Sequence, residues 1–87
     1  MKFTVVWVPS AADRLADLWI EAEDREAIAS ATNQIDKLLK SDPSQQGESR
    51  LGSRRILIVP PLIVAIEIHE PDRVVKVLGV RLQSRKR

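Results

Sequence analysis

Apolar residues recur along this chain with two different periods, and the change between the periods divides it into elements. Residues 2–8 alternate, with three apolar side chains on one side and Val6 and Val8 on the other. The alternation predicts a strand, and apolar residues on both sides favour a place inside the sheet rather than at its edge. Pro9 is expected to end this strand, because proline has no N–H to donate to a ladder.

The next part of the chain has the apolar spacing of two amphipathic helices. Ser10 is the expected N-cap of the first helix, and Asp13 is expected to favour the helix dipole in its first turn. A polar break at residues 23–24 precedes the second helix. That helix is expected to end near Ser41, because Pro43 disfavours helical backbone in the residue before it. The short break predicts an antiparallel helix hairpin.

The C-terminal half changes to short β-branched runs separated by turns. Residues 41–53 are a loop by composition. Strands are expected at residues 55–59, 62–70 and 74–81, joined by two proline-containing turns. Gly79 is expected to mark a β-bulge or a close approach of another group to the backbone.

Together these elements predict an α+β fold with the order β-α-α-β-β-β. A single domain is expected over residues 1–87, with a basic C-terminal tail at about residues 82–87. The helix hairpin is expected to pack on one face of a small, mainly antiparallel sheet. The other face is left open, as in small α+β domains that present a binding surface, and we expect it to be polar and basic in part.

Composition narrows the classes of function. Of 87 residues, 44% are hydrophobic and 30% are charged, which is typical of one globular domain. The chain has no cysteine and one histidine, so we expect no disulfide framework, no metal site and no cofactor. No apolar run approaches the ~20 residues of a membrane span. The apolar run near the N-terminus is too short for a secretory signal, so a cytoplasmic location is expected.

Charge is distributed unevenly along the chain. Residues 1–48 hold 5 Lys/Arg and 9 Asp/Glu, a net −4, whereas residues 49–87 hold 9 and 3, a net +6. Arg and Lys gathered on a small domain suggest an anionic partner such as RNA, DNA or an acidic protein segment. Solvated basic tails are also common on soluble proteins, and this alternative stays open.

Several motifs, in this order and spacing, resemble the RelE/ParE superfamily of bacterial toxins from type II toxin–antitoxin modules. The first strand and helix read V-x-W-x-P-S-A-x-x-x-L, and the second helix ends in L-L-K-x-D-P before a Gly and an Arg. An arginine-led strand then precedes P-L-x-V-x-x-x-I and D-R-x-V-x-V-x-x-V. The matching residues are Val5, Trp7, Pro9, Ala11 or Ala12, Leu15, Leu38, Leu39, Asp42, Pro43, Gly47, Arg50, Arg55–Leu57 and Pro61–Val80.

The resemblance, which covers nearly the whole chain, implies a growth-inhibiting toxin. Such toxins, some of which act in plasmid stabilisation, are neutralised by a small acidic antitoxin whose C-terminal segment wraps them. Members similar to RelE cleave mRNA in the ribosomal A site, which would make this chain a metal-independent endoribonuclease, an mRNA interferase. Members similar to ParE are non-enzymatic inhibitors of DNA gyrase, and a degenerate member would retain only antitoxin binding. The shared fold does not decide between these alternatives.

Metal-free RNA cleavage needs a base for the 2′-OH proton, cations for the phosphorane and an acid for the leaving 5′-oxygen. We predict His69, Arg54 and Arg81 as the catalytic residues. Histidine is the side chain whose ordinary pKa lies near neutrality. The two arginines lie at strand ends, where a guanidinium engages phosphate oxygens bidentately. Further phosphate or RNA contacts are predicted for four basic residues, Arg50, Arg55, Arg85 and Lys86.

Other interpretations of these residues stay open. In one alternative, His69 is only a solvated side chain next to a turn. In the same interpretation, Arg54 and Arg55 pair with Glu67 or with an antitoxin carboxylate. The family's third strand typically carries an arginine and an aromatic residue, but residues 62–66 hold neither and the chain has no tyrosine. This departure favours the gyrase interpretation, whereas the basic C-terminal half favours RNA.

Two further expectations concern apolar side chains. Trp7 and Trp19 fall on the apolar sides of their elements, so we expect them to pack in the core rather than to stack on bases. Val6 and Ile63 are expected on an uncovered edge or face, where they make a homodimer possible.

Overall fold

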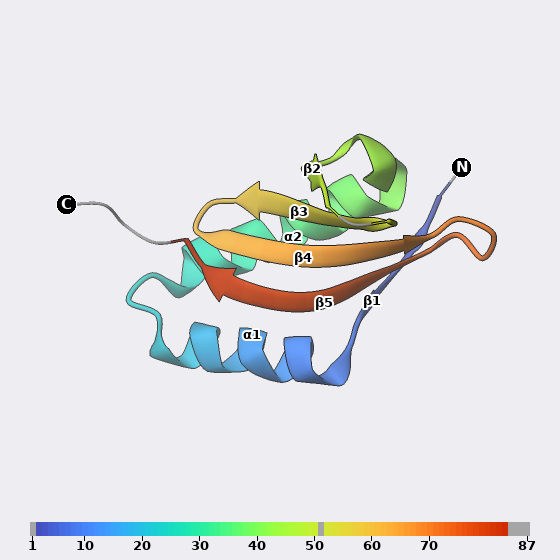
Figure 1. The fold of residues 1–87 in the computed structure, drawn as a ribbon. Helices are drawn as coiled ribbons and strands as arrows, with labels where there is room; N and C mark the ends of the chain where they lie inside the picture. The colour runs from blue at the N-terminus through green and yellow to red at the C-terminus, as the bar shows by residue number, and fades with distance from the viewer. Residues whose placement is uncertain (1, 51, 84–87) are drawn as a thin grey trace.

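The computed structural model describes residues 2–50 and 52–83 and shows a helix pair packed on one five-stranded sheet (Figure 1). The elements, in chain order, are β1 (Thr4–Trp7), α1 (Pro9–Glu21), α2 (Arg25–Ser41), the 3₁₀ turn η1 (Pro43–Gln45), β2 (Glu48–Ser49), β3 (Arg54–Val59), β4 (Leu62–His69) and β5 (Val74–Leu82). The strand order is β1-β5-β4-β3-β2, and only the β1–β5 pair is parallel. The predicted α+β class is confirmed.

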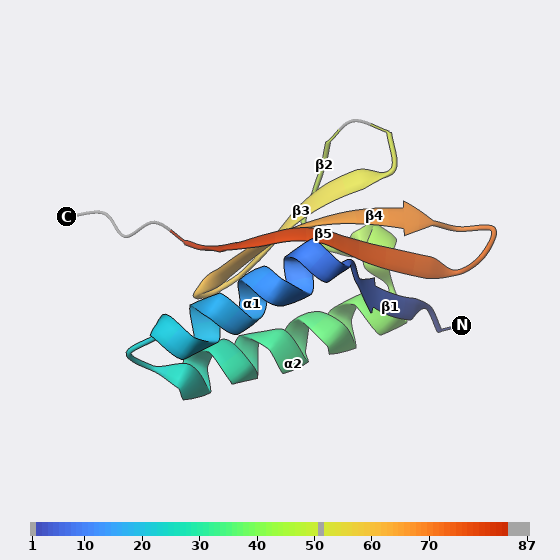
Figure 2. The same cartoon turned by 90° about the horizontal axis from the view of Figure 1, so that it is seen from below.

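Both helices cover the same face of the sheet and lie side by side in opposite directions (Figure 2). Alternate residues of β4 face them, and Leu62, Val64 and Ile66 are completely buried. Ile35 and Leu39 of α2 are equally buried and fill the space between the helices and the sheet. No helix in the described parts of the chain is long and apolar enough to cross a membrane.

The C-terminal strands follow the predicted pattern closely. β3, β4 and β5 begin or end within one residue of their predicted bounds. A backbone hydrogen bond from Arg73 N to Glu70 O closes the turn between β4 and β5. Ala65 pairs with Gly79 and Ile66 with Val77, so β5 carries one extra residue, and the predicted bulge is confirmed.

The predicted loop contains structure that its composition does not indicate. The segment that follows α2 forms η1 and then the short strand β2, which pairs antiparallel with β3. Arg55 holds this segment in place by donating from Nε to Gln46 O at 2.6 Å and from Nη2 to Gly47 O at 3.0 Å. Two backbone groups just before β2 thus receive a side-chain partner, which keeps a mostly polar segment ordered.

The first strand and the first helix correct two predictions. β1 lies at an edge of the sheet, because it pairs only with β5, and Val6 is 41% exposed there. Apolar residues on both sides of a strand therefore did not indicate an interior position. α1 begins at Pro9, and the N-cap position is occupied by Val8, whose side chain makes no capping hydrogen bond. Proline suits the first helical position, because the N–H group that it lacks would have no acceptor within the helix. Ser10 therefore lies inside the helix and is not its N-cap.

The same helix has no acidic residue in its first turn, so the dipole role predicted for Asp13 is also wrong. A side-chain N-cap is present in the second helix, where no cap was predicted. The Asp24 side chain accepts a hydrogen bond from Ala27 N at 3.0 Å at the start of α2. The end of α2 at Ser41 confirms the prediction made from Pro43.

The two tryptophans differ in environment. Trp7 packs against the core and donates from Nε1 to Asp36 Oδ1 at 3.2 Å, as a half-buried indole requires. Trp19 is 43% exposed, so the prediction that it packs in the core is wrong. It lies with Ile20 beside an apolar groove of about 470 Å³ between α1 and α2, and the guanidinium carbon of Arg25 lies 4.6 Å from its ring centroid.

Candidate functional site

The sheet face that points away from the helices carries the three predicted catalytic residues, Arg54, His69 and Arg81, and we call it the open face. The strand register places three cross-strand rows on it. One row joins Arg54, Glu67 and Lys76, and a second joins Ile56, Ala65 and Gly79. The third row joins Ile58, Ile63 and Arg81. The face is therefore charged near its ends and apolar in its middle, so only part of it is polar and basic, as predicted.

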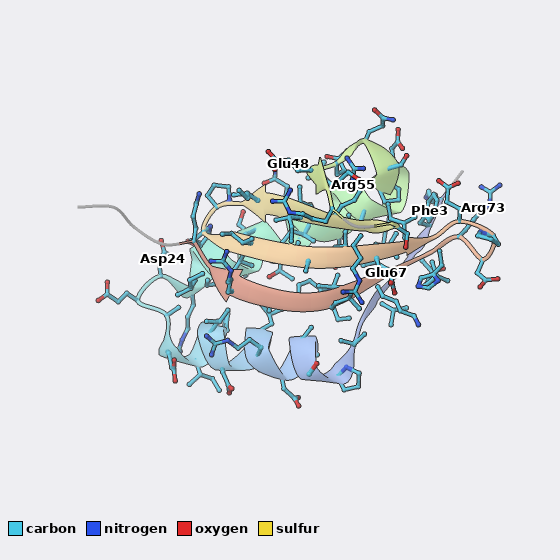
Figure 3. All side chains as sticks on the ribbon, viewed as in Figure 1. Phe3, Asp24, Glu48, Arg55, Glu67 and Arg73 are labelled. Atoms are coloured by element: carbon cyan, nitrogen blue, oxygen red, sulfur yellow. The ribbon has the colours of Figure 1, made fainter. Side chains whose placement is uncertain are left out.

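Three side chains meet at one end of the open face, and we call Arg54, Glu67 and His69 the Glu67 cluster. His69 Nε2 lies 3.1 Å from Glu67 Oε1, and Arg54 Nε lies 3.5 Å from Glu67 Oε2. Glu67 and His69 are two residues apart on β4 and so point to the same side of the sheet. Arg54 comes from β3, where the register places it directly opposite Glu67. Figure 3 shows Glu67 over the strands of the sheet.

The electrostatics of the cluster favour an ionised carboxylate. The hydrogen bond from His69 lowers the pKa of Glu67 below its ordinary value of 4.5, burial partly opposes the shift, and Arg54 lowers the pKa further. Arg54 and His69 keep 61% and 39% of their side chains exposed, so both contacts are screened by solvent. A ligand phosphate can therefore replace Glu67 as the partner of Arg54 at little cost in free energy.

We expect a pH-dependent contribution of Glu67 to stability. Interactions that favour the ionised form are fully present above the ordinary carboxylate pKa and are lost as the pH falls through the lower pKa of the folded state. Glu67→Gln should therefore lower the free energy of unfolding slightly at pH 7 and leave it unchanged at a pH well below 4.5. Urea unfolding of both proteins at the two pH values measures this difference. An equal difference at both would contradict it.

The remaining predicted residues are placed less favourably. The Arg55 guanidinium donates its hydrogen bonds to backbone carbonyl groups of the segment before β2, so this side chain has a structural role. Figure 3 labels Arg55 beside that segment. Arg50 pairs with Glu48 at 3.2 Å on the surface. Arg81 makes no ion pair with any residue in the described ranges 2–50 and 52–83. Arg85 and Lys86 lie outside the described residues.

Arg81 does not join the Glu67 cluster. It pairs with Ile63, whereas Arg54 pairs with Glu67, four residues further along β4. Four residues span ~13 Å along a strand, and β3 and β5 are separated by ~10 Å across the sheet. The two arginine Cα atoms are thus about 16 Å apart, at opposite ends of the open face.

A shallow hollow occupies the middle of the open face, and we call it the central depression. It consists of two adjoining hollows of about 390 and 300 Å³ that share Ile56, Ala65 and Gly79 as their floor. Arg50, Arg54 and Arg55 line one end, and Arg81 lines the other. Guanidinium groups at both ends of an apolar hollow suit an occupant with an apolar centre and two anionic flanks.

The Glu67 cluster contains the groups that metal-free phosphodiester cleavage requires. A carboxylate can take a proton, an imidazole can give one, and a guanidinium can stabilise the charge that develops on phosphorus oxygens. Glu67 was considered from the sequence only as a partner of Arg54. The signal that could have identified it is the spacing Glu67-x-His69 on one strand. No group of three or more His, Cys, Asp or Glu side chains in the described parts of the chain is placed to hold a metal ion.

No family model matches this sequence, and a search of curated proteins finds no match either. Solved structures do match over almost the whole chain. A chain of the toxin–antitoxin complex RelBE2 from Mycobacterium tuberculosis has a TM-score of 0.76 at 15% identity, with 98% of this chain and 95% of that chain covered.

Two further structures give similar values. A chain of the chromosomal ParDE toxin–antitoxin system from P. aeruginosa has a TM-score of 0.71 at 15% identity, with 95% and 98% covered. The isolated RelE toxin from E. coli has a TM-score of 0.68 at 13% identity, with 97% and 87% covered. The chain therefore has the RelE/ParE fold, as its motifs predict. Because both RelE and ParE proteins are among the matches, the fold does not separate the two mechanisms.

Proposed function

We propose that this chain is the toxin of a type II toxin–antitoxin module and that it inhibits growth by ribosome-dependent cleavage of mRNA. Its RelE/ParE fold supports the toxin role, and the Glu67 cluster supports the cleavage. That cluster is the observation that carries the proposal, because it gathers a carboxylate, an imidazole and a guanidinium on an exposed face. The site of action would be the cytoplasm, and the partners would be the ribosome with its mRNA and a small acidic antitoxin.

Each residue of the cluster has a role in this chemistry. A phosphate that binds Arg54 displaces Glu67, which then accepts the proton of the 2′-OH. The 2′-oxygen attacks phosphorus and forms a cyclic phosphate, and the bond to the 5′-oxygen breaks. His69 gives its proton to that leaving oxygen, and Arg54 stabilises the negative charge of the phosphorane. Arg81 is too distant for the same phosphate and instead binds a neighbouring one.

A ParE-like inhibitor of gyrase remains the second candidate, and one observation favours it. The middle of the open face is apolar, with Ile63 and Ala65 where a cleaving member of the family would carry polar or aromatic groups. Such a face suits contact with another protein better than contact with an RNA backbone. A degenerate member that retains only antitoxin binding would need neither surface.

Induction of the protein in a bacterial host, with and without the neighbouring antitoxin gene, tests the proposal. We expect growth arrest, mRNA cut within translated regions, unchanged DNA supercoiling, and rescue by the antitoxin. An SOS response with intact mRNA would replace RNA cleavage by gyrase inhibition. Normal growth at full expression would leave only antitoxin binding, which co-purification of the two proteins then measures.

A further inference from the structure

The helix pair keeps an apolar surface on the side that faces away from the sheet. Figure 2 shows α1 and α2 side by side on one side of the sheet, and the groove of about 470 Å³ lies between them. Seven of the nine residues that line this groove are apolar. Trp19 and Ile20 are 43% and 59% exposed in it. Large apolar side chains that are gathered in one groove, rather than scattered singly, mark an interaction surface.

Arg25 holds one wall of this groove in place. Its guanidinium donates from Nε to Trp19 O at 3.1 Å and from Nη2 to Ile20 O at 3.0 Å. The guanidinium carbon also lies 4.6 Å from the centroid of the Trp19 ring. The end of α1 and its indole are thus ordered before a partner binds, so association loses less conformational entropy. Tryptophan is also among the residues that contribute most to binding at protein interfaces.

The two rims of the groove carry opposite charges at one end. Asp13 follows the groove residue Ala12 on α1, and Lys37 lies one turn beyond the groove residue Asn33 on α2. Because the helices are antiparallel, Asp13 and Lys37 both lie toward the end that is far from the turn between them. Both residues are exposed, and neither forms an ion pair with any residue of the ranges 2–50 and 52–83.

This distribution of charge is complementary to itself. When two copies face each other across a two-fold axis parallel to the helices, α1 of one copy lies over α2 of the other. Each Asp13 then lies opposite Lys37 of the second copy. An acidic segment of another protein would instead meet the carboxylate of Asp13 on one rim. At the turn end, Glu21 and Glu26 face each other as like charges, which limits the affinity of the pair.

We propose that the groove between α1 and α2 binds the same groove of a second copy of this chain, in a symmetric dimer centred on Trp19 and Ile20. α1 has 13 residues and is about 20 Å long, and the helix pair is about 20 Å wide, so each copy contributes roughly 400 Å². That area is small for a specific interface, so the dissociation constant is micromolar or weaker. Val6 and Ile63, the dimer contacts expected from the sequence, lie on the sheet and take no part.

The dimer leaves the candidate functional site accessible. The helices cover one face of the sheet, so the open faces of the two copies point away from each other. The inference therefore does not depend on the proposed function, and a variant that cannot dimerise should still act as wild type does on the open face.

Ile20→Glu should prevent the dimer, because it places an unpaired carboxylate in an apolar interface. Sedimentation velocity over concentrations from about 1 to 500 μM measures the association. Wild type should change from monomer to dimer in this range, and the variant should associate at least about tenfold more weakly. Ile58→Glu, the same change at a 51% exposed position on the open face, is the matched control and should dimerise as wild type. Far-UV circular dichroism shows that both variants are folded.

Charge exchange tests the orientation of the two copies. Asp13→Lys and Lys37→Asp should each weaken the dimer roughly three- to tenfold, because each places like charges opposite one another at an exposed contact. The double variant should recover most of the affinity of wild type, because the attraction is restored with its signs exchanged. Salt should reduce all of these differences. A double variant that is weaker than both single variants would contradict the pairing of Asp13 with Lys37 and with it the proposed dimer.

Two further results would overturn the inference. Wild type that stays monomeric over the whole range has no such dimer, and if Ile20→Glu then also fails to co-purify with the antitoxin, the groove binds the antitoxin instead. An undiminished dimer of Ile20→Glu would place the interface elsewhere. Growth arrest on induction tests the proposed function separately, and we expect Ile20→Glu to arrest growth as wild type does.

Discussion

His69→Ala is expected to lower the rate of RNA cleavage by about 10²- to 10⁴-fold, the usual loss when a general acid is removed. His69 is the only histidine of the chain, and its Nε2 lies 3.1 Å from Glu67 Oε1. No neighbouring side chain in the cluster can replace it as a proton donor near neutral pH, because Arg54 stays protonated. Stability should change little, since His69 is partly exposed and lies at the end of β4.

Single-turnover cleavage of a ribosome-bound mRNA measures this loss, and Arg14→Ala on the exposed side of α1 is a matched control that should cleave as wild type. The pH–rate profile distinguishes acid catalysis from a purely structural effect. A limb of the wild-type profile that is absent from the residual activity of His69→Ala would assign the proton transfer to His69. Equal rates in wild type and variant would remove His69 from the mechanism, as would two profiles of the same shape.

Gly47→Ala is expected to destabilise the fold by about 3 kcal/mol or more, a large share of the stability of a small domain. Gly47 has a φ of +66°, where a residue with a side chain is strained by roughly 1–3 kcal/mol. An added Cβ would also overlap the carbonyl oxygen of Ile56, a backbone atom that cannot move without disturbing β3. The contacts of Arg55 with Gly47 O and Gln46 O would then be lost.

Gly52→Ala is the matched control for this substitution. Gly52 has a similar φ of +61°, but a Cβ there would meet nothing within 4 Å. It should therefore cost only the backbone strain, about 1–2 kcal/mol. Urea unfolding of the two variants and of wild type gives the difference directly. Equal losses in the two variants would show that the overlap with Ile56 is relieved at no cost and that strain alone matters.

The sequence determined those parts of the fold that depend on local patterns. Alternating β-branched residues with turn residues between them specify β3, β4 and β5, because a hairpin needs only a short loop and a period of two. The end of α2 before Pro43 and the bulge at Gly79 follow from backbone constraints on single residues. These features were correctly predicted because no distant residue is needed to produce them.

Other features depend on which surfaces meet in three dimensions. Trp19 has the same helical spacing as a core residue, yet the sheet is already covered by other residues of α1 and α2, and Trp19 is left in the outer groove. β1 has the apolar pattern of an interior strand, but the crossover through the helices brings it to the edge beside β5. Short-range periodicity carries no information about which neighbour a strand or helix acquires.

For the candidate site, the sequence determined the residue types, and only the tertiary structure determined their grouping. It identified His69, Arg54 and Arg81, but the pairing register of β3 and β4 places Arg54 opposite Glu67 and so assembles the Glu67 cluster. The register of β4 and β5 places Arg81 opposite Ile63, at the other end of the open face. Registers arise from the way whole strands bury their apolar sides, so the distances between charged groups on the outer side follow only from the folded sheet.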